Sequence, residues 1–314
     1  QTRGRPPPPV ARGAAVNGVR PRVMQLLALF LFALAANAAP LKIVATTAEM
    51  RSLAQAVGGD RVEVASLIPP GIDGEAFQPR PQDVAMLRDA RLVVRVGADY
   101  DLWLDGLLRQ SGNAAIQRGG AGYVDASSDV ALLDVRAGGI AGDGHAHGRG
   151  NPHYWLDPVN AQAITGTLLE ALARVDPANA RRYEANRLAF LAALESRLGE
   201  WQRLLSRPPA LIAYHDTWPY LARRFRLRFV GIIESRPGIA ASPSHLAQLV
   251  RAAGDGHVAA VVREPHEPSR DADFIASRAG ARVAILASGV GAVPAARDYL
   301  SLIDYNVRTL ATLQ

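Results

Sequence analysis

Short apolar runs rich in valine, isoleucine and leucine alternate with stretches of helical spacing along most of this 314-residue chain. Turn residues end the runs, as Pro69-Pro70-Gly71 does after the run at residues 61–67. Strands that alternate with helices pair in parallel through right-handed crossovers. The alternation therefore predicts an α/β fold with doubly wound parallel sheets.

The alternation occurs twice, before and after one long helical stretch at residues 177–205. This stretch would extend about 44 Å, and leucines and a tryptophan at three- and four-residue steps predict a buried stripe along it: Leu188, Leu191, Leu194, Leu198, Trp201 and Leu205. A chain of this length also exceeds what one core usually serves. We therefore expect two lobes, at residues 39–175 and 208–314, joined by a linking helix within residues 176–207.

The expected elements of each half follow from the same patterns. In the first half we expect strands at residues 41–46, 61–67, 91–96 and near 123, with helices at 47–57, 81–90, 101–108 and 158–174. In the second half we expect strands at 210–214, 228–233, 258–263 and 282–286, with helices starting at 217, 244 and 269. Ligands of such sheets bind beyond the carboxyl ends of the strands, so the facing lobes predict a cleft.

The first 38 residues have the layout of a secretory signal peptide. They hold five arginines and no acidic residue, followed by the apolar run Leu26–Ala36 and the small residues Ala36-Asn37-Ala38. Met24 is a candidate initiator, which would leave residues 1–23 as upstream sequence. The alternative is an uncleaved membrane anchor, but the apolar run is short for a span. We therefore expect export to the periplasm.

The charge balance argues against a nucleic-acid-binding protein, and the absence of cysteine argues against a disulfide-stabilised or lipid-anchored one. The net charge of +6 comes largely from the leader, because without its five arginines the 35 basic residues fall to 30 against 29 acidic ones. That balance leaves no broad basic surface for nucleic acid. The chain has no cysteine, so it has neither disulfides nor a cysteine for lipid attachment. We expect a monomer that depends on its core for stability.

The octapeptide Asn151–Pro158 is the most distinctive motif, because it places His153 between a proline and the start of a helix. Asp157 followed by Pro158 predicts a helix N-cap with proline at the first helical position. His153 would then be a fixed ligand at the mouth of that helix. Just upstream, the glycine-rich segment 142–148 carries His145 and His147, a composition that suits transient metal capture or a plain linker.

Four further polar residues follow predicted strands or precede predicted helices. His215 comes directly after the run at residues 210–214, and Glu75 lies in a proline-limited loop after the second strand, where rigidity would hold its carboxylate in place. Glu264 and His266 precede Pro268 and a helix, where helix-terminus electrostatics is an alternative role. We expect Glu75, His153 and His215 to meet around one metal ion, with Glu264 and His266 nearby.

These residues resemble the receptors of zinc and manganese ABC importers, the ZnuA/TroA-like family, over residues 41–310. The features that carry the resemblance occur in family order: Gly71–Asp83, His145–Asp157, Asp176–Ala180, Tyr214-His215-Asp216, Pro237–Pro243 and Arg263-Glu264-Pro265. The resemblance implies two α/β lobes joined by one long helix, a metal site in the cleft, and delivery to a membrane permease. It also implies ligand roles for His153 and His215.

The chain departs from the family pattern at two positions. The first ligand, usually a histidine after Asp-Pro, is Glu75 after Asp73-Gly74, and the usual late aspartate is missing from Leu286-Ala287-Ser288-Gly289. Glu264, His266 or water is then the fourth ligand. Two imidazoles with a carboxylate suit Zn²⁺ best, with Mn²⁺ and Fe²⁺ as alternatives that the hard Glu75 ligand favours.

Two other functions fit the same residues. Two histidines and a carboxylate also make catalytic zinc or non-haem iron sites, but the chain lacks a His-Glu-x-x-His helix and a Gly-x-Ser-x-Gly elbow after a strand. We therefore expect no enzyme. A periplasmic metal chaperone or buffer that serves no transporter is the third interpretation.

Overall fold

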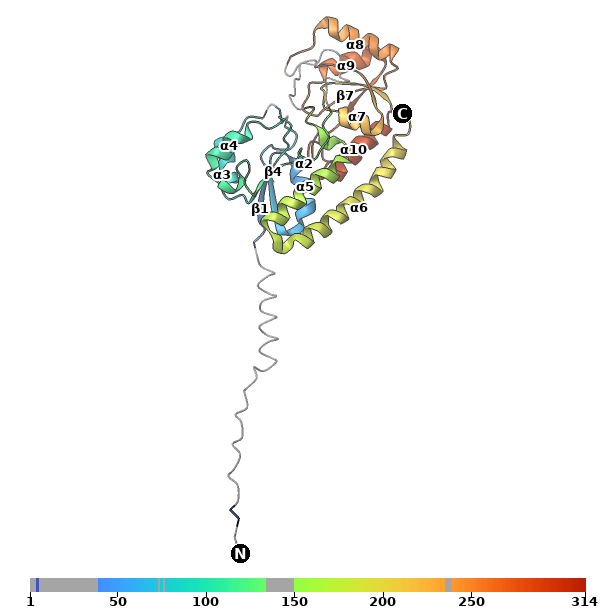
Figure 1. Cartoon of the computed structure of the whole chain (residues 1–314). Helices are drawn as coiled ribbons and strands as arrows, with labels where there is room; N and C mark the ends of the chain where they lie inside the picture. The colour runs from blue at the N-terminus through green and yellow to red at the C-terminus, as the bar shows by residue number, and fades with distance from the viewer. Residues whose placement is uncertain (1–3, 6–38, 73, 76, 134–149, 235–238) are drawn as a thin grey trace. The chain divides into compact units, whose positions relative to one another are not determined.

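The computed structural model of the chain describes residues 4–5, 39–72, 74–75, 77–133, 150–234 and 239–314. The predicted leader, apart from Gly4 and Arg5, and the segment with His145 and His147 lie outside these residues. Residues 1–39 and 40–314 form separate compact units, and the fold described below is that of Pro40–Gln314 (Figure 1). Within the described residues, every helix is too short or too polar to cross a membrane.

The first lobe contains a four-stranded parallel sheet in the order β2-β1-β3-β4. Its strands are β1 (Leu41–Ala45), β2 (Val62–Ser66), β3 (Leu92–Arg95) and β4 (Tyr123–Asp125). Its helices are α2 (Ala48–Gly58), α3 (Pro81–Arg88), α4 (Leu104–Ser111) and α5 (Asn160–Val175). The strand order reverses between β1 and β3, which makes this a doubly wound sheet.

The second lobe repeats this topology with a sheet in the order β6-β5-β7-β8. Its strands are β5 (Ala210–Ala213), β6 (Arg228–Ile232), β7 (Ala260–Arg263) and β8 (Arg282–Ile285). Its helices are α7 (Pro219–Phe225), α8 (Pro243–Asp255), α9 (Arg270–Ala279) and α10 (Tyr299–Ala311). The two doubly wound sheets with a long helix between them in the chain confirm the fold predicted from the sequence.

One hydrophobic core runs through both lobes. Alternate strand residues face opposite sides of a sheet: Ile43 and Ala45 of β1 point into this shared core, whereas Val44 joins a separate core under α3 and α4. In β5, Leu211 joins the shared core and Ile212 a separate core under α8 and α9. Because a large apolar interface opposes separation of domains, the two lobes form a stiff body.

Helix α6 (Ala180–Leu204) links the lobes, and a short 3-10 turn at Pro177–Asn179 precedes it. The helix packs against α2 and α5 of the first lobe and against α10 of the second. The predicted stripe is wrong at Leu188, which is 58% exposed. In the N-terminal half of α6 the buried stripe passes instead through Tyr183 and Phe190. Counted back from Leu194 at 3.6 residues per turn, these two residues lie on the same face of the helix, whereas Leu188 lies on another face.

The predicted helix start at Asp157 is also wrong, because α5 begins at Asn160. Residues Tyr154–Leu156 instead form a 3-10 turn, and Asp157 accepts a hydrogen bond from the Val159 amide. The fully buried Asp157 carboxylate pairs with Arg224 of α7 at 2.7 Å. Pairing with the second lobe therefore takes the place of most of the predicted capping role.

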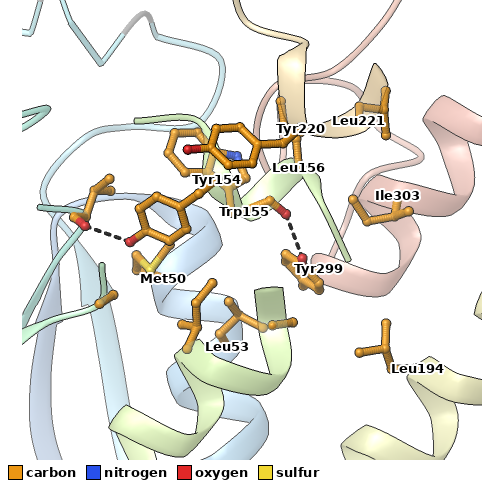
Figure 2. Close-up of a cluster of buried hydrophobic side chains, with 14 of the residues drawn as sticks. Met50, Leu53, Tyr154, Trp155, Leu156, Leu194, Tyr220, Leu221, Tyr299 and Ile303 are labelled. Atoms are coloured by element: carbon orange, nitrogen blue, oxygen red, sulfur yellow. Dashed lines mark hydrogen bonds between the residues drawn. The ribbon is translucent and has the colours of Figure 1, made fainter. Parts of the chain in front are cut away.

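The segment Asn151–Asp157 fastens the lobes together. Figure 2 shows Tyr154, Trp155 and Leu156 in the shared core beside Tyr220 and Tyr299 of the second lobe. The Tyr154 hydroxyl donates to the carbonyl of Val96 after β3, and the Tyr299 hydroxyl donates to the carbonyl of Trp155 (both 2.6 Å). His153, at the start of this turn, is therefore held from both lobes.

Candidate metal centre

A cavity of about 610 Å³ opens where the carboxyl ends of the two sheets face each other. Segments that follow β1, β2 and β3 line it from the first lobe, and segments that follow β5, β6, β7 and β8 line it from the second. The reversal points of both strand orders lie at this edge of each sheet. The cavity therefore lies where a doubly wound fold binds its ligand.

Three of the predicted ligands converge inside this cavity. The Nε2 atom of His153 lies 3.9 Å from Oε1 of Glu75, and the Nε2 atom of His215 lies 3.7 Å from Oε2 of Glu75. Two ligands of a tetrahedral ion with bonds of about 2.1 Å are about 3.4 Å apart. The two distances measured here exceed this ligand–ligand separation by about 0.5 and 0.3 Å.

His153 is 6% exposed and is held by Asn151. The side-chain oxygen of Asn151 accepts a hydrogen bond from the His153 backbone N–H at 3.0 Å and lies 3.1 Å from Nδ1 of the imidazole. The rings of Tyr100 and Trp155 pack against the imidazole, with centroids 5.9 and 5.3 Å away. These contacts direct Nε2 of His153 toward Glu75.

His215 lies two residues beyond the end of β5, as predicted, and its Nδ1 is 3.0 Å from the carboxylate of Glu234. Burial alone would lower the pKa of His215, but hydrogen bonds to Glu234 and Glu75 outweigh it and raise the pKa to about 11. The metal-free site at neutral pH therefore holds an imidazolium between two carboxylates. A divalent cation would replace that proton at Nε2.

Glu75 lies in the loop between β2 and α3, and its side chain is 20% exposed. Its neighbour Gly74 lies against the Tyr100 hydroxyl, where a β-carbon would come within 2.0 Å of the oxygen. A residue with a side chain at position 74 would therefore displace Tyr100 or the loop.

The structure places Glu264 and His266 in the wall of the same cavity, beyond β7. Oε1 of Glu264 accepts a hydrogen bond from Thr217 at 2.8 Å, and Oε2 accepts one from the hydroxyl of Ser288. His266 Nδ1 lies 3.8 Å from Glu264 Oε2. Both carboxylate oxygens of Glu264 therefore already have hydroxyl partners.

Glu264, His266 and Glu267 form a cluster in which one donor atom of each lies within 4.8 Å of the others. Burial and then the neighbouring Glu264 carboxylate raise the pKa of Glu267 to about 8, and burial raises the pKa of Glu264. This wall of the cavity is therefore acidic without carrying two full negative charges at neutral pH. The remaining negative charge would attract cations into the cavity.

Sequence reasoning missed three residues of the site. Glu234 lies two residues beyond the end of β6, as His215 does beyond β5, so the rule that identified His215 at a strand end also applies to it. Asn151 was part of the octapeptide but had no predicted role. Glu49 of α2, 5% exposed, accepts a hydrogen bond from the Val290 amide of the second lobe at 2.9 Å; its sequence context gives no signal, because it reads as an ordinary first-turn glutamate.

Comparison with known proteins identifies similar sequences and structures. Residues 43–313 match the model of the family described as zinc-uptake complex component A, periplasmic (ZnuA). The high-affinity zinc uptake system protein ZnuA of Bacillus subtilis is 26% identical over 86% of each chain. The iron-binding protein YfeA of Yersinia pestis is 27% identical over 86% of this chain and 85% of its own.

Solved structures share the fold over nearly the whole body. A crystal structure of ZnuA superimposes with a TM-score of 0.74 at 25% identity, covering 87% of this chain and 98% of that one. An Mn-bound periplasmic metal binding protein from candidatus liberibacter asiaticus gives a TM-score of 0.72 at 17% identity, covering 87% and 99%. The second likeness concerns the fold alone.

Proposed function

The chain belongs to the ZnuA family of periplasmic zinc-uptake components, and from this premise we propose that Glu75, His153 and His215 bind a divalent transition-metal ion for an ABC importer. Proteins of this family are solute-binding receptors, and the relatives of this chain include a zinc uptake protein and an iron-binding protein. The metal is the cargo of this protein. It is captured in the cleft and handed to the membrane permease.

The observation that carries the proposal is the convergence of one carboxylate and two imidazoles from three separate loops, with Glu75 within 3.9 Å of both histidines. Nε2 of each histidine and the carboxylate of Glu75 bind the ion. Glu264, His266 or water completes the coordination, and hydrogen bonds from Thr217 and Ser288 hold the carboxyl group of Glu264 in the cavity wall. Glu264 places a buried carboxyl group in the cavity wall, and Nδ1 of His266 lies 3.8 Å from its Oε2.

Zinc is the ion that this donor set favours, because nitrogen and oxygen ligands at tetrahedral geometry suit it. Manganese and iron are the alternatives, since carboxylate ligands favour harder ions and affinity order alone does not select a metal. Glu75, in the place where the family usually has histidine, moves the preference toward these harder ions. One relative of this chain is named for zinc and another for iron, which supports keeping both ions as candidates.

The protein reaches its partner as an exported monomer. The leader at residues 1–38 is a signal peptide that is cleaved on export, and the mature protein works in the periplasm. The lobes span residues 39–175 and 208–314, with the linking helix within 176–207. Because the lobes share one core, release of the metal involves small movements of the cavity loops around a stiff body.

Metal titration of single variants tests the proposal. His153→Ala and His215→Ala should each raise the dissociation constant for Zn²⁺ at least tenfold, because each removes a ligand. His257→Asn is the matched control: His257 is exposed, and its φ of 51° is one that asparagine tolerates. If both variants fold and bind zinc as tightly as wild type, the metal site does not lie in this cleft.

Two assays separate the competing functions. Loss of metal uptake in cells that lack the protein supports a receptor, whereas unchanged uptake supports a chaperone or buffer without a transporter. Turnover of esters, peptides or oxygen by the purified metal-loaded protein would instead indicate an enzyme.

A further inference from the structure

Asn151 makes hydrogen bonds with both histidine-bearing segments. Its side chain is fully buried, its oxygen accepts from the His153 N–H at 3.0 Å, and its nitrogen donates to the carbonyl of Asp216 at 2.9 Å. Asp216 follows His215 directly in the chain. One amide side chain therefore connects the loop of His153 with the loop of His215.

The main-chain groups fix which way this amide points. The backbone N–H of His153 can only donate, and the carbonyl of Asp216 can only accept. A rotation that exchanged the amide oxygen and nitrogen would place donor against donor and acceptor against acceptor. The oxygen of Asn151 must therefore face His153, and the nitrogen must face Asp216.

The orientation of the amide determines which nitrogen of His153 carries the proton. The Asn151 oxygen lies 3.1 Å from Nδ1 of His153, and an amide oxygen only accepts hydrogen bonds. Nδ1 must then be protonated, which leaves the lone pair of the neutral imidazole on Nε2. Nε2 is the atom that faces Glu75 at 3.9 Å.

The main chain of Asn151 is held as firmly as its side chain. Its carbonyl accepts from the Tyr220 hydroxyl at 2.7 Å, and its N–H donates to the carbonyl of Leu133 at 2.9 Å. The Tyr220 hydroxyl in turn accepts from the Leu133 N–H at 2.8 Å. Both ends of the residue are thus anchored, so the amide cannot follow His153 into another arrangement.

We propose that Asn151 is the positioning residue of this metal site, which holds His153 as the Nδ1–H tautomer and links it to the His215 loop. The inference rests on the proposed function, because the Nδ1–H tautomer leaves on Nε2 the lone pair that would bind the metal ion. Removing a residue that orients a metal-binding histidine through a hydrogen bond typically weakens metal binding 10- to 100-fold. His215 has a different partner, Glu234, so the two ligands are held by an amide and a carboxylate respectively.

Two substitutions separate the acceptor from the donor of the amide. Asn151→Asp keeps an oxygen for His153 and loses the donor to Asp216, whereas Asn151→Leu is of similar size and loses both. We expect Asn151→Asp to bind Zn²⁺ within about threefold of wild type, and Asn151→Leu to bind about 10- to 100-fold more weakly. Because both variants lose the donor to Asp216, both should also be less stable than wild type.

The control is Asn113→Asp. Asn113 of the first lobe also holds main-chain groups through its amide, donating to the carbonyls of Leu87 and Ala90, and it is absent from the cavity wall. This variant should bind zinc as wild type does. Equal affinities for Asn151→Asp and Asn151→Leu would overturn the inference, since a structural role alone predicts a common loss.

The tautomer itself can be measured on the unaltered protein, which keeps the test independent of how the variants fold. The ¹⁵N spectrum of the neutral imidazole of His153, assigned by its loss in His153→Ala, should show a proton on Nδ1 in the metal-free protein. A proton on Nε2 contradicts the inference. If His153→Ala weakens zinc binding and Asn151→Leu does not, only the role of Asn151 fails; if neither changes binding, the proposed function fails with it.

Discussion

Metal binding should release a proton from His215 even in alkaline solution. Hydrogen bonds to Glu234 and Glu75 overcome the effect of burial and raise the pKa of His215 to about 11. At pH 8 a histidine with the ordinary pKa of 6.5 is only about 3% protonated. His215, in contrast, should be protonated in nearly every molecule of the metal-free protein.

The size of the effect follows from this difference. A metal ion takes Nε2 of His215, so binding at pH 8 should release about one proton from this residue, compared with about 0.03 for a histidine with the ordinary pKa. The dissociation constant should then fall about tenfold for each unit of pH between pH 7 and 9. The slope describes a competition between one proton and one metal ion.

Calorimetry measures the released protons directly, as the difference in binding enthalpy between two buffers that differ in ionisation enthalpy and bind the metal weakly. Glu267, with a pKa raised to about 8, contributes to the same signal. The measurement is therefore repeated in the Glu267→Gln variant, where about one proton should remain. Release of less than about 0.2 protons in that variant would refute the paired state of His215.

Further predictions concern Glu75, the segment at residues 142–148, the Asp157–Arg224 pair and the effect of pH on stability. Glu75→His should shift competition between zinc and manganese toward zinc, and unchanged competition would argue against Glu75 as a ligand. Deleting residues 142–148 should alter uptake more than the affinity of the tight site, and loss of that site would contradict the division. Asp157→Asn should lower the free energy of unfolding by about 2 kcal/mol, less than for a fully buried pair because Arg224 is 27% exposed; an unchanged midpoint of thermal unfolding would show that the pair contributes nothing. In the metal-free protein, the raised pKa of His215 should make stability greatest below about pH 6.5 and reduce it as the pH rises toward 11, and urea unfolding across that range measures the loss.

The fold was predictable because each half repeats a simple pattern. Runs such as Leu41–Ala45, in which Lys42 is the one polar residue, and Ala210–Ala213 are short apolar strands, and prolines precede both. Helix α10 was not predicted, although Asp298 caps it and Tyr299, Leu302, Ile303, Val307 and Leu310 repeat at helical steps. The sequence after residue 286 therefore carries the signal for this helix.

Two errors of detail had different causes. At Leu188 the leucine spacing agreed with a helical stripe, but α6 faces the core through Tyr183 and Phe190. Asp157 has the residue type of a helix cap, but its carboxylate forms an ion pair with Arg224 of the second lobe. The first outcome follows from the helical period itself, which places Tyr183 and Phe190, and not Leu188, on the face of Leu194. The second depends on which element of the other lobe lies opposite, and the sequence of one segment does not contain that information.

The site was predictable to the extent that strand ends meet in a doubly wound fold. His215 after β5 and Glu264 after β7 follow that rule, as does Glu234 after β6, which was overlooked. His153 and Glu75 lie in irregular loops, where only motif and composition served as guides. That Ser288 and Thr217 engage Glu264 depends on side-chain geometry, which no sequence pattern specifies.

The central claim is that Glu75, His153 and His215 bind the same ion. A crystal structure of the metal-loaded protein, with anomalous scattering recorded at the zinc, iron and manganese edges, tests it most directly. The account predicts a single strong peak about 2.0–2.2 Å from Nε2 of both histidines and from a carboxylate oxygen of Glu75. A fully occupied metal elsewhere in the protein, with these three side chains still in contact only with one another, would contradict it.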